Sequence, residues 1–114
     1  MKLVPAGICA LFAIGAVAVA AEKPVRFWNL TSETVTSLRL APVGTKDFGT
    51  DLTKGDSDGA VDHDERLPIK NLQPGTYDAS IGFKSGRSCM AKGVKIEAAS
   101  VFSIEEKDLS LCSK

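Results

Sequence analysis

Residues 74–97 read PGTYDASIGFKSGRSCMAKGVKIE, and this stretch decides the fold class. Every second residue of its first half is apolar, which is the period of a β-strand with one buried face. These residues are Tyr77, Ala79, Ile81 and Phe83. The dipeptide Ser85-Gly86 then predicts a tight hairpin with Gly86 at positive φ. The stretch therefore predicts two antiparallel strands, at 76–84 and 88–97.

The rest of the chain contains further runs of the same kind. Runs rich in Val, Ile, Thr and aromatic residues occur at 25–30, 34–40, 66–69 and 101–104. Turn signals separate them at intervals of about eight to twelve residues, which favours an antiparallel sandwich. No long helical period follows residue 21, although a short helical turn near 105–109 is compatible with the sequence. We therefore predict an all-β protein, a small antiparallel β-sandwich of the immunoglobulin-like kind.

Residues 1–20 have the pattern of a secretory signal peptide. Lys2 is followed by an apolar run and by Ala18-Val19-Ala20, which forms an A-x-A cleavage site. A transmembrane anchor is the alternative, and it fits less well because the run is short and rich in Ala and Gly. Cleavage would leave residues 21–114, room for one small domain. We expect this domain in the periplasm, with no membrane attachment.

The domain left by cleavage contains two cysteines, Cys89 and Cys112, because Cys9 is removed with the signal peptide. An even pair in an exported protein, without metal-type spacing, predicts one disulfide. It would close a loop of about twenty residues and contribute about 3 kcal/mol on the chain-entropy model. A redox or metal-binding pair is the alternative, but the sequence offers neither a C-x-x-C spacing nor a neighbouring His.

The stretch 51–65, DLTKGDSDGAVDHDE, concentrates negative charge. It holds six carboxylates and one base, Lys54, for a formal charge of −5. The whole chain has 14 basic and 14 acidic residues, so the remainder carries +5. Lys and Arg are scattered there, which argues against a nucleic-acid-binding face. The stretch belongs to a connection, 41–65, long enough that we expect it to be functional or disordered.

Such an oxygen-rich loop suits a hard cation. Ca²⁺ and trivalent lanthanides take about six to nine oxygen ligands, mainly carboxylates and carbonyls. The loop partly matches the calcium template D-x-[DN]-x-[DN]-G-x5-E when Gly59 is placed at the template glycine. Lys54 then occupies the first ligand position, and no helices flank the loop, so we predict an EF-like loop within a β-protein. The predicted ligands are Asp56, Asp58, Asp62, Asp64 and Glu65.

The identity of the ion and the number of chains that bind it stay open at this point. Five acids exceed what Ca²⁺ needs for charge balance, which favours a lanthanide(III) ion, with Ca²⁺ as the alternative. The ligands could be divided between two chains, with the metal at a homodimer interface. His63 could bind a softer metal, although a lone exposed His is more often inert. A solvated acidic loop that binds cations weakly is the simpler alternative.

Motifs that would indicate an enzyme are absent from the sequence. It contains no G-x-S-x-G, H-E-x-x-H, Walker or dinucleotide-binding fingerprint, and His63 has no identifiable nucleophile as its partner. We therefore expect a binding protein and not an enzyme. Besides metal binding, a module of the same fold that binds a periplasmic protein partner is the second hypothesis.

Four short stretches resemble one family. They are FWNLT at 27–31, DFG at 47–49, GAVDHDERL at 59–67 and PGTYD at 74–78. On these stretches the chain resembles small periplasmic β-sandwich proteins of bacteria, in particular lanthanide chaperones of the landiscernin type. The resemblance implies a light-lanthanide-binding protein in which metal binding is coupled to dimerisation, with the five acids as its site. Because Lys54 stands where a calcium loop has a carboxylate, a second copy of the loop would supply the remaining ligands.

Overall fold

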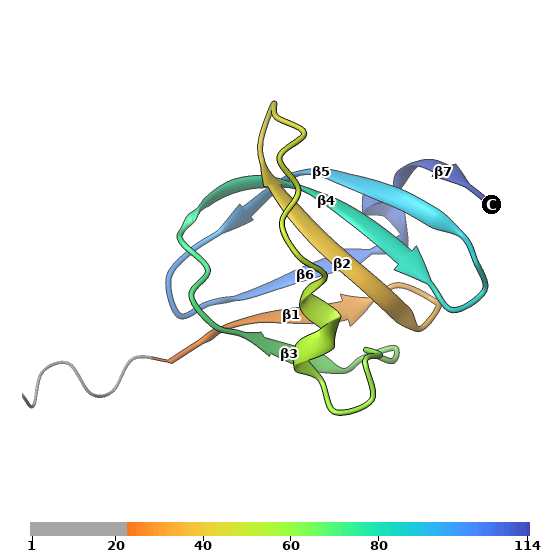
Figure 1. The fold of residues 1–114 in the computed structure, drawn as a ribbon, viewed down its shortest axis with the longest axis horizontal. Coiled ribbons are helices and arrows are strands. Elements are labelled where there is room, and N and C mark those ends of the chain that lie inside the picture. Colours follow the sequence, from red (N-terminus) through yellow and green to blue (C-terminus); the bar gives the residue numbers. More distant parts are fainter. Residues whose placement is uncertain (1–22) are drawn as a thin grey trace, which may run out of the picture.

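The computed structural model describes residues 23–114, which form two β-sheets facing each other across one core (Figure 1). The strands are β1 (Val25–Leu30), β2 (Val35–Pro42), β3 (Arg66–Ile69), β4 (Gly75–Phe83), β5 (Ser88–Ile96), β6 (Val101–Glu105) and β7 (Ser110–Ser113). One sheet has three strands in the order β3-β1-β6, and the other has four in the order β2-β4-β5-β7. The predicted signal peptide, 1–20, lies outside the described residues.

Two short 3₁₀ helices, η1 (Leu52–Gly55) and η2 (Glu106–Asp108), complete the secondary structure of the described chain. The second confirms the helical turn that the sequence allows near 105–109. Between residues 23 and 114 there is no helix with the length and apolar character needed to cross a membrane. The all-β prediction is therefore confirmed.

The β4–β5 hairpin follows from the alternation that predicts it. Ala79, Ile81 and Phe83 are buried, and Gly86 turns the chain at φ 97°. Asp78 departs from the pattern because the β4–β5 register shifts between Tyr77 and Ala79. Its buried carboxylate accepts hydrogen bonds from the N–H groups of Gly44 (3.3 Å) and Gly93 (3.1 Å). The carboxylate of Asp78 thus links β4 to the end of β2 and to β5.

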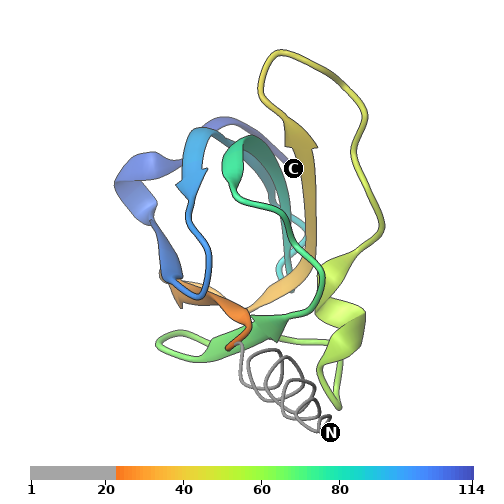
Figure 2. The same ribbon diagram turned by 90° about the vertical axis from the view of Figure 1, so that its left-hand side faces the viewer.

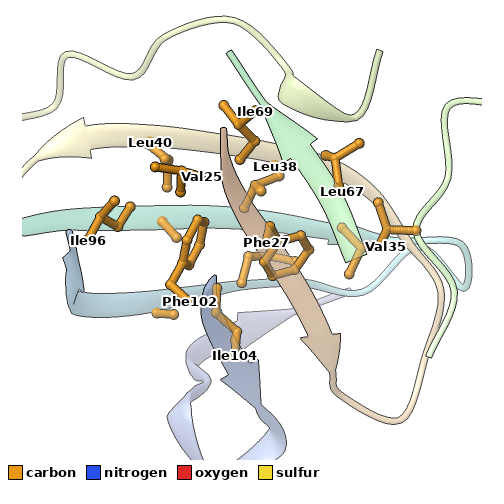
Figure 3. Packing of buried hydrophobic residues seen from close by; sticks show 14 of the residues in the cluster. Val25, Phe27, Val35, Leu38, Leu40, Leu67, Ile69, Ile96, Phe102 and Ile104 are labelled. Atoms are coloured by element: carbon orange, nitrogen blue, oxygen red, sulfur yellow. The ribbon is translucent and has the colours of Figure 1, made fainter. Parts of the chain in front are cut away.

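The core fills the space between the two sheets. Phe27 of β1 and Phe102 of β6 lie together there, with ring centroids 5.5 Å apart (Figure 3). Leu38 of β2 and Ile81 of β4 close the core from the other sheet. Trp28, the next residue of β1, lies on the outer face of the strand and is half-exposed.

Two features of the sheets differ from a purely antiparallel sandwich. β1 pairs with β6 in parallel, with Arg26 opposite Val101. β2, β4 and β5, which belong to the other sheet, lie between β1 and β6 in the chain and provide the long connection that a parallel pair requires. β7 is also new: it is a short, exposed strand that pairs with β5 at Ser88 and Met90. The disulfide Cys89–Cys112, predicted from the sequence, is present and holds β7 to β5.

The connection between β2 and β3 covers the outer edge of β2 and is ordered by that contact. Val35 and Val61 exchange two backbone hydrogen bonds, of 2.9 and 2.8 Å. Asp51 Oδ1 accepts from the N–H of Leu38 at 3.0 Å, and Thr53 donates to the carbonyl of Thr36 at 3.1 Å. Figure 2 shows this yellow-to-green segment running alongside β2. The connection between β2 and β3 is therefore long because it covers the edge of β2.

Candidate functional site

Residues 62–65, here called the acidic turn, are fixed against the end of β1. The N–H of Glu65 donates to the carbonyl of Asp62 at 3.0 Å and closes the turn. Asp64 adopts the left-handed conformation, φ 71°, which Asp tolerates better than most residues. The N–H of Asp64 donates to the carbonyl of Asn29 (2.6 Å), and the N–H of Asn29 donates to the carbonyl of Glu65 (3.0 Å). The turn is therefore continuous with the three-stranded sheet.

Asn29 is the buried residue that organises this end of the sandwich. Its side chain has no exposed surface, and its Nδ2 donates to the carbonyls of Val61 (2.8 Å) and Glu33 (2.9 Å). Its Oδ1 accepts from the N–H (2.9 Å) and the hydroxyl (2.6 Å) of Thr31. Both donors and both acceptor positions of the amide are therefore satisfied. Asn29 joins the β1–β2 turn to the residue that precedes the acidic turn.

Asn29 was not identified from the sequence as a buried residue, although the pattern of β1 indicates its burial. Val25 and Phe27 define the inward phase of β1, and Asn29 continues that phase. A polar residue at an inward position of a strand requires internal hydrogen bonds. The alternation alone could therefore have identified it as a buried amide.

The carboxylates of the acidic turn are exposed, and each makes a local hydrogen bond. Asp62 Oδ1 accepts from the hydroxyl of Thr34 at 3.0 Å. Asp64 Oδ1 accepts from the indole Nε1 of Trp28 at 2.9 Å. Glu65 Oε1 accepts from the backbone N–H of Asp62 at 2.7 Å. One oxygen of each carboxylate is thus used to shape the turn.

Two further side chains make contacts at the acidic turn: Arg66, which follows it, and His63, which lies within it. The guanidinium of Arg66 lies 4.1 Å from the centroid of the Trp28 ring, so it stacks on the indole that Asp64 contacts. His63 Nδ1 lies 2.7 Å from the carbonyl of Thr31, which makes Nδ1 the protonated nitrogen. His63 therefore has a structural contact that the sequence did not indicate.

The remaining predicted ligands lie in the preceding turn. Asp56 Oδ1 accepts from the N–H of Ser57 (2.7 Å), and Asp58 Oδ1 accepts from the N–H of Ala60 (3.1 Å). Gly59 follows Asp58 with φ 71°, as the sharp bend between them requires. These are the local contacts that Asp residues commonly make in turns.

The five predicted ligands do not surround one point. Within residues 23–114 no group of three or more His, Cys, Asp or Glu side chains is arranged to hold a metal ion. Val61, which is fully buried and pairs with Val35, separates the two groups of acids. The structure thus brings Asp62, Asp64 and Glu65 together within one turn and leaves Asp56 and Asp58 in another.

Asp51, the first acid of the stretch, is a capping residue. Its Oδ1 accepts from the N–H groups of Leu38 and Thr53 (both 3.0 Å) and from the Thr53 hydroxyl (2.7 Å). Burial alone would raise the pKa of Asp51, but these hydrogen bonds outweigh it and lower the pKa below its ordinary value. Asp51 thereby fixes η1 against the edge of β2.

A second charged cluster joins three turns on the β1–β2 side of the molecule. Arg87 contacts Glu106 (Nη2 to Oε1, 3.0 Å) and Glu33 (Nε to Oε2, 2.9 Å). Glu106 also accepts from the N–H and the hydroxyl of Ser32. The hydrogen bonds from Arg87, followed by those from Ser32, lower the pKa of Glu106 from 4.5 to about 2. This cluster ties η2 to the β1–β2 and β4–β5 turns.

Comparison with protein-family models, with curated proteins and with solved structures finds no match for this chain. Its function is therefore inferred from its own residues.

Proposed function

We propose that this chain is an exported, immunoglobulin-like β-sandwich protein that binds a hard cation at the acidic turn and passes it on as a metal chaperone. The observation that carries the proposal is that Asp62, Asp64 and Glu65 project from one four-residue turn fixed to the sheet. The disulfide Cys89–Cys112 is compatible with export to the periplasm. The two facing sheets, of three and four strands, support the immunoglobulin-like classification.

The donor atoms fit a hard cation. Among the described residues, Asp62 and Asp64 accept hydrogen bonds through Oδ1, and Glu65 accepts one through Oε1. Because these three carboxylates do not converge on one point in the described residues, the proposal requires the cation to draw the second oxygen of each toward itself. The −5 charge of residues 51–65 raises the local concentration of cations around these oxygens.

Three carboxylates supply part of a coordination shell. Hard cations require about six to nine oxygen ligands, so we propose that a second copy of the chain supplies the rest. Binding is then linked to dimerisation, as the resemblance to lanthanide chaperones implies. The number of acids favours a light lanthanide(III) ion over Ca²⁺ because two facing turns would overcompensate a divalent charge. Asp56 and Asp58, in the preceding turn, add to the negative charge of residues 51–65.

Titration with Tb³⁺ tests the proposal. Trp28 is the only tryptophan of the chain, and its indole nitrogen lies 2.9 Å from Asp64 Oδ1. A Tb³⁺ ion bound by Asp64 would lie close enough to the indole for excitation of Trp28 to produce Tb³⁺ emission. We expect emission that saturates at one ion per two chains, with a doubling of mass in light scattering. A light lanthanide should displace Tb³⁺, and Ca²⁺ should do so only at much higher concentration.

Asp-to-Asn variants separate charge from shape, since Asn keeps the Oδ1 acceptor. D62N/D64N should weaken binding by at least about tenfold, because each lost charge removes a ligand of the ion. D47N is the matched control: Asp47 is exposed and lies outside the acidic turn. Unchanged affinity in D62N/D64N, or millimolar binding of both Tb³⁺ and Ca²⁺, would contradict the proposal. A stronger effect of D56N/D58N would place the site in the preceding turn.

A protein-interaction module is the second candidate function. The observation that favours it is that β6, unlike β2, has no covering segment along its outer edge among the described residues. In that case Ca²⁺ would bind the acidic turn only weakly. Capture of a partner protein that survives treatment with a chelator would favour this alternative.

A further inference from the structure

The edge strands of the two sheets are protected to different degrees. The segment 43–61 covers β2, and β7 covers the first part of β5. β3 has four residues, and one of them is Pro68, which has no N–H to offer at a sheet edge. β6 has five residues, contains no proline, and has β1 as its one neighbour within residues 23–114. It is therefore the edge best suited to pair with another strand.

The unpaired backbone groups of β6 follow from its register with β1. Arg26 lies opposite Val101, and the Arg26 N–H donates to the carbonyl of Ser100 at 3.0 Å. In a parallel pair with this register, every second residue of β6 directs its N–H and C=O groups toward β1, and the residues between them direct theirs outward. Val101 and Ser103 therefore present their N–H and C=O groups to the free edge. Glu105 ends the edge because its N–H donates to Asp108 Oδ2 at 2.8 Å.

A groove of about 250 Å³ follows this edge, between β6 and the part of β5 beyond β7. Buried residues of both strands, Phe102 and Ala91 among them, form its apolar part. Its charged residues are the exposed Lys92 and Lys95 on β5 and a single acid, Asp108. With two lysines and one acid, the groove carries a formal charge of +1.

We propose that β6 binds an extended acidic segment of a partner protein, which adds to the three-stranded sheet as a fourth strand. Backbone hydrogen bonds to Val101 and Ser103 would supply affinity without sequence specificity. Specificity would come from alternation, since successive side chains of a strand point to opposite faces. Side chains that point inward would enter the groove beside Phe102, and acidic ones near its rim would pair with Lys92 and Lys95.

Charge complementarity favours an acidic partner over a second copy of this chain. Pairing β6 with its counterpart in a second copy would bring the lysines of both grooves to the same junction, where they repel each other. An acidic strand instead compensates Lys92 and Lys95. The inference does not depend on metal binding, because the groove and the acidic turn are formed by different residues.

The test uses the oxidised, ¹⁵N-labelled domain, residues 21–114, in the presence of a chelator. The probe is a peptide of about ten residues in which Val and Glu alternate, and the matched peptide has Lys in place of Glu. We expect the Glu peptide to shift the amide signals of Val101, Ser103 and the Lys92–Lys95 segment. It should also slow hydrogen exchange at Val101 and Ser103. The Lys peptide should bind at least about tenfold more weakly.

Charge reversal provides the control for folding. In K92E/K95E the preference should invert, so that the Lys peptide binds more tightly than the Glu peptide, an outcome that an unfolded variant cannot give. K46E/K84E changes two exposed lysines outside the groove and should leave both affinities unchanged. S103P removes one outward N–H of β6 and should weaken the Glu peptide.

Four outcomes would overturn the proposal. They are equal affinity for the two peptides, amide shifts confined to other strands, no shift at millimolar peptide, and self-association that S103P abolishes. The last would identify a second copy as the occupant of the edge. A change in Tb³⁺ binding bears only on the acidic turn, so failure of the two proposals can be distinguished.

Discussion

Replacing Asn29 by Ala removes the buried amide that joins the acidic turn to the sandwich. The change leaves the N–H of Thr31 without its hydrogen-bond partner. The carbonyl of Val61 and the hydroxyl of Thr31 each lose one hydrogen bond and keep another, to the N–H of Val35 and to the carbonyl of Glu33. A buried unsatisfied N–H costs about 1–3 kcal/mol, and each of the other lost hydrogen bonds, including the one to the carbonyl of Glu33, adds about 0.5–1.5 kcal/mol. Because water can reach part of the vacated space, we expect a total loss of about 3–5 kcal/mol. That is a large fraction of the roughly 5–15 kcal/mol by which domains are stable.

Urea unfolding followed by Trp28 fluorescence measures the loss. In thermal unfolding, a domain of this size loses about 4–8 °C in Tm for each kcal/mol of stability lost, so N29A should lower Tm by at least about 12 °C. N29D keeps the acceptor oxygen but turns a carboxylate toward the carbonyls of Val61 and Glu33, so it should be no more stable than N29A. Q73A is the control, because Gln73 is exposed. A loss below about 1 kcal/mol in N29A would refute the assignment of Asn29 as the organising residue.

Three further changes test other contacts. Because Arg87 lowers the pKa of Glu106 to about 2, the ion pair should stabilise the fold fully above pH 4.5 and be lost as the pH falls toward 2. E106Q should remove that pH dependence, which urea titrations between pH 2 and 7 would measure. The free energy of unfolding should change by at most about 1 kcal/mol, because the carboxylate is half-exposed. Reduction of Cys89–Cys112 should cost about 3 kcal/mol in urea titrations with and without reductant, and a C112S variant that is equally stable would contradict this. D51A should lower stability by about 1 kcal/mol, the usual effect of removing a cap, and differential scanning calorimetry would detect it.

The parts of the fold that the sequence predicts are those with local causes. Alternation over 77–83 and the turn at Gly86 specify the β4–β5 hairpin without reference to the rest of the chain. The disulfide is predicted from an even pair of cysteines that follows a stretch with the pattern of a signal peptide. The parallel β1–β6 pair and β7 could not be predicted, because they depend on which strands meet when the two sheets close.

The candidate site shows the limit of reasoning from composition. Asp has the same chemistry as a ligand and as a turn residue, since either role uses its carboxylate oxygens as acceptors. Asp58 and Asp62 fit a calcium template by spacing, but spacing does not reveal that Val61 between them is buried against Val35. One buried valine therefore divides a sequence motif into two turns.

The sheet order also has a kinetic consequence. β4 and β5 are joined by a short turn, so their hairpin requires closure of only a small loop. β1 begins the described chain, yet its partner β6 lies near the other end, with Arg26 opposite Val101. Pairings between residues so distant in sequence slow folding. We therefore expect the hairpin to form early and β1 to insert between β3 and β6 last, with high φ-values at Ala79 and low ones at Phe27.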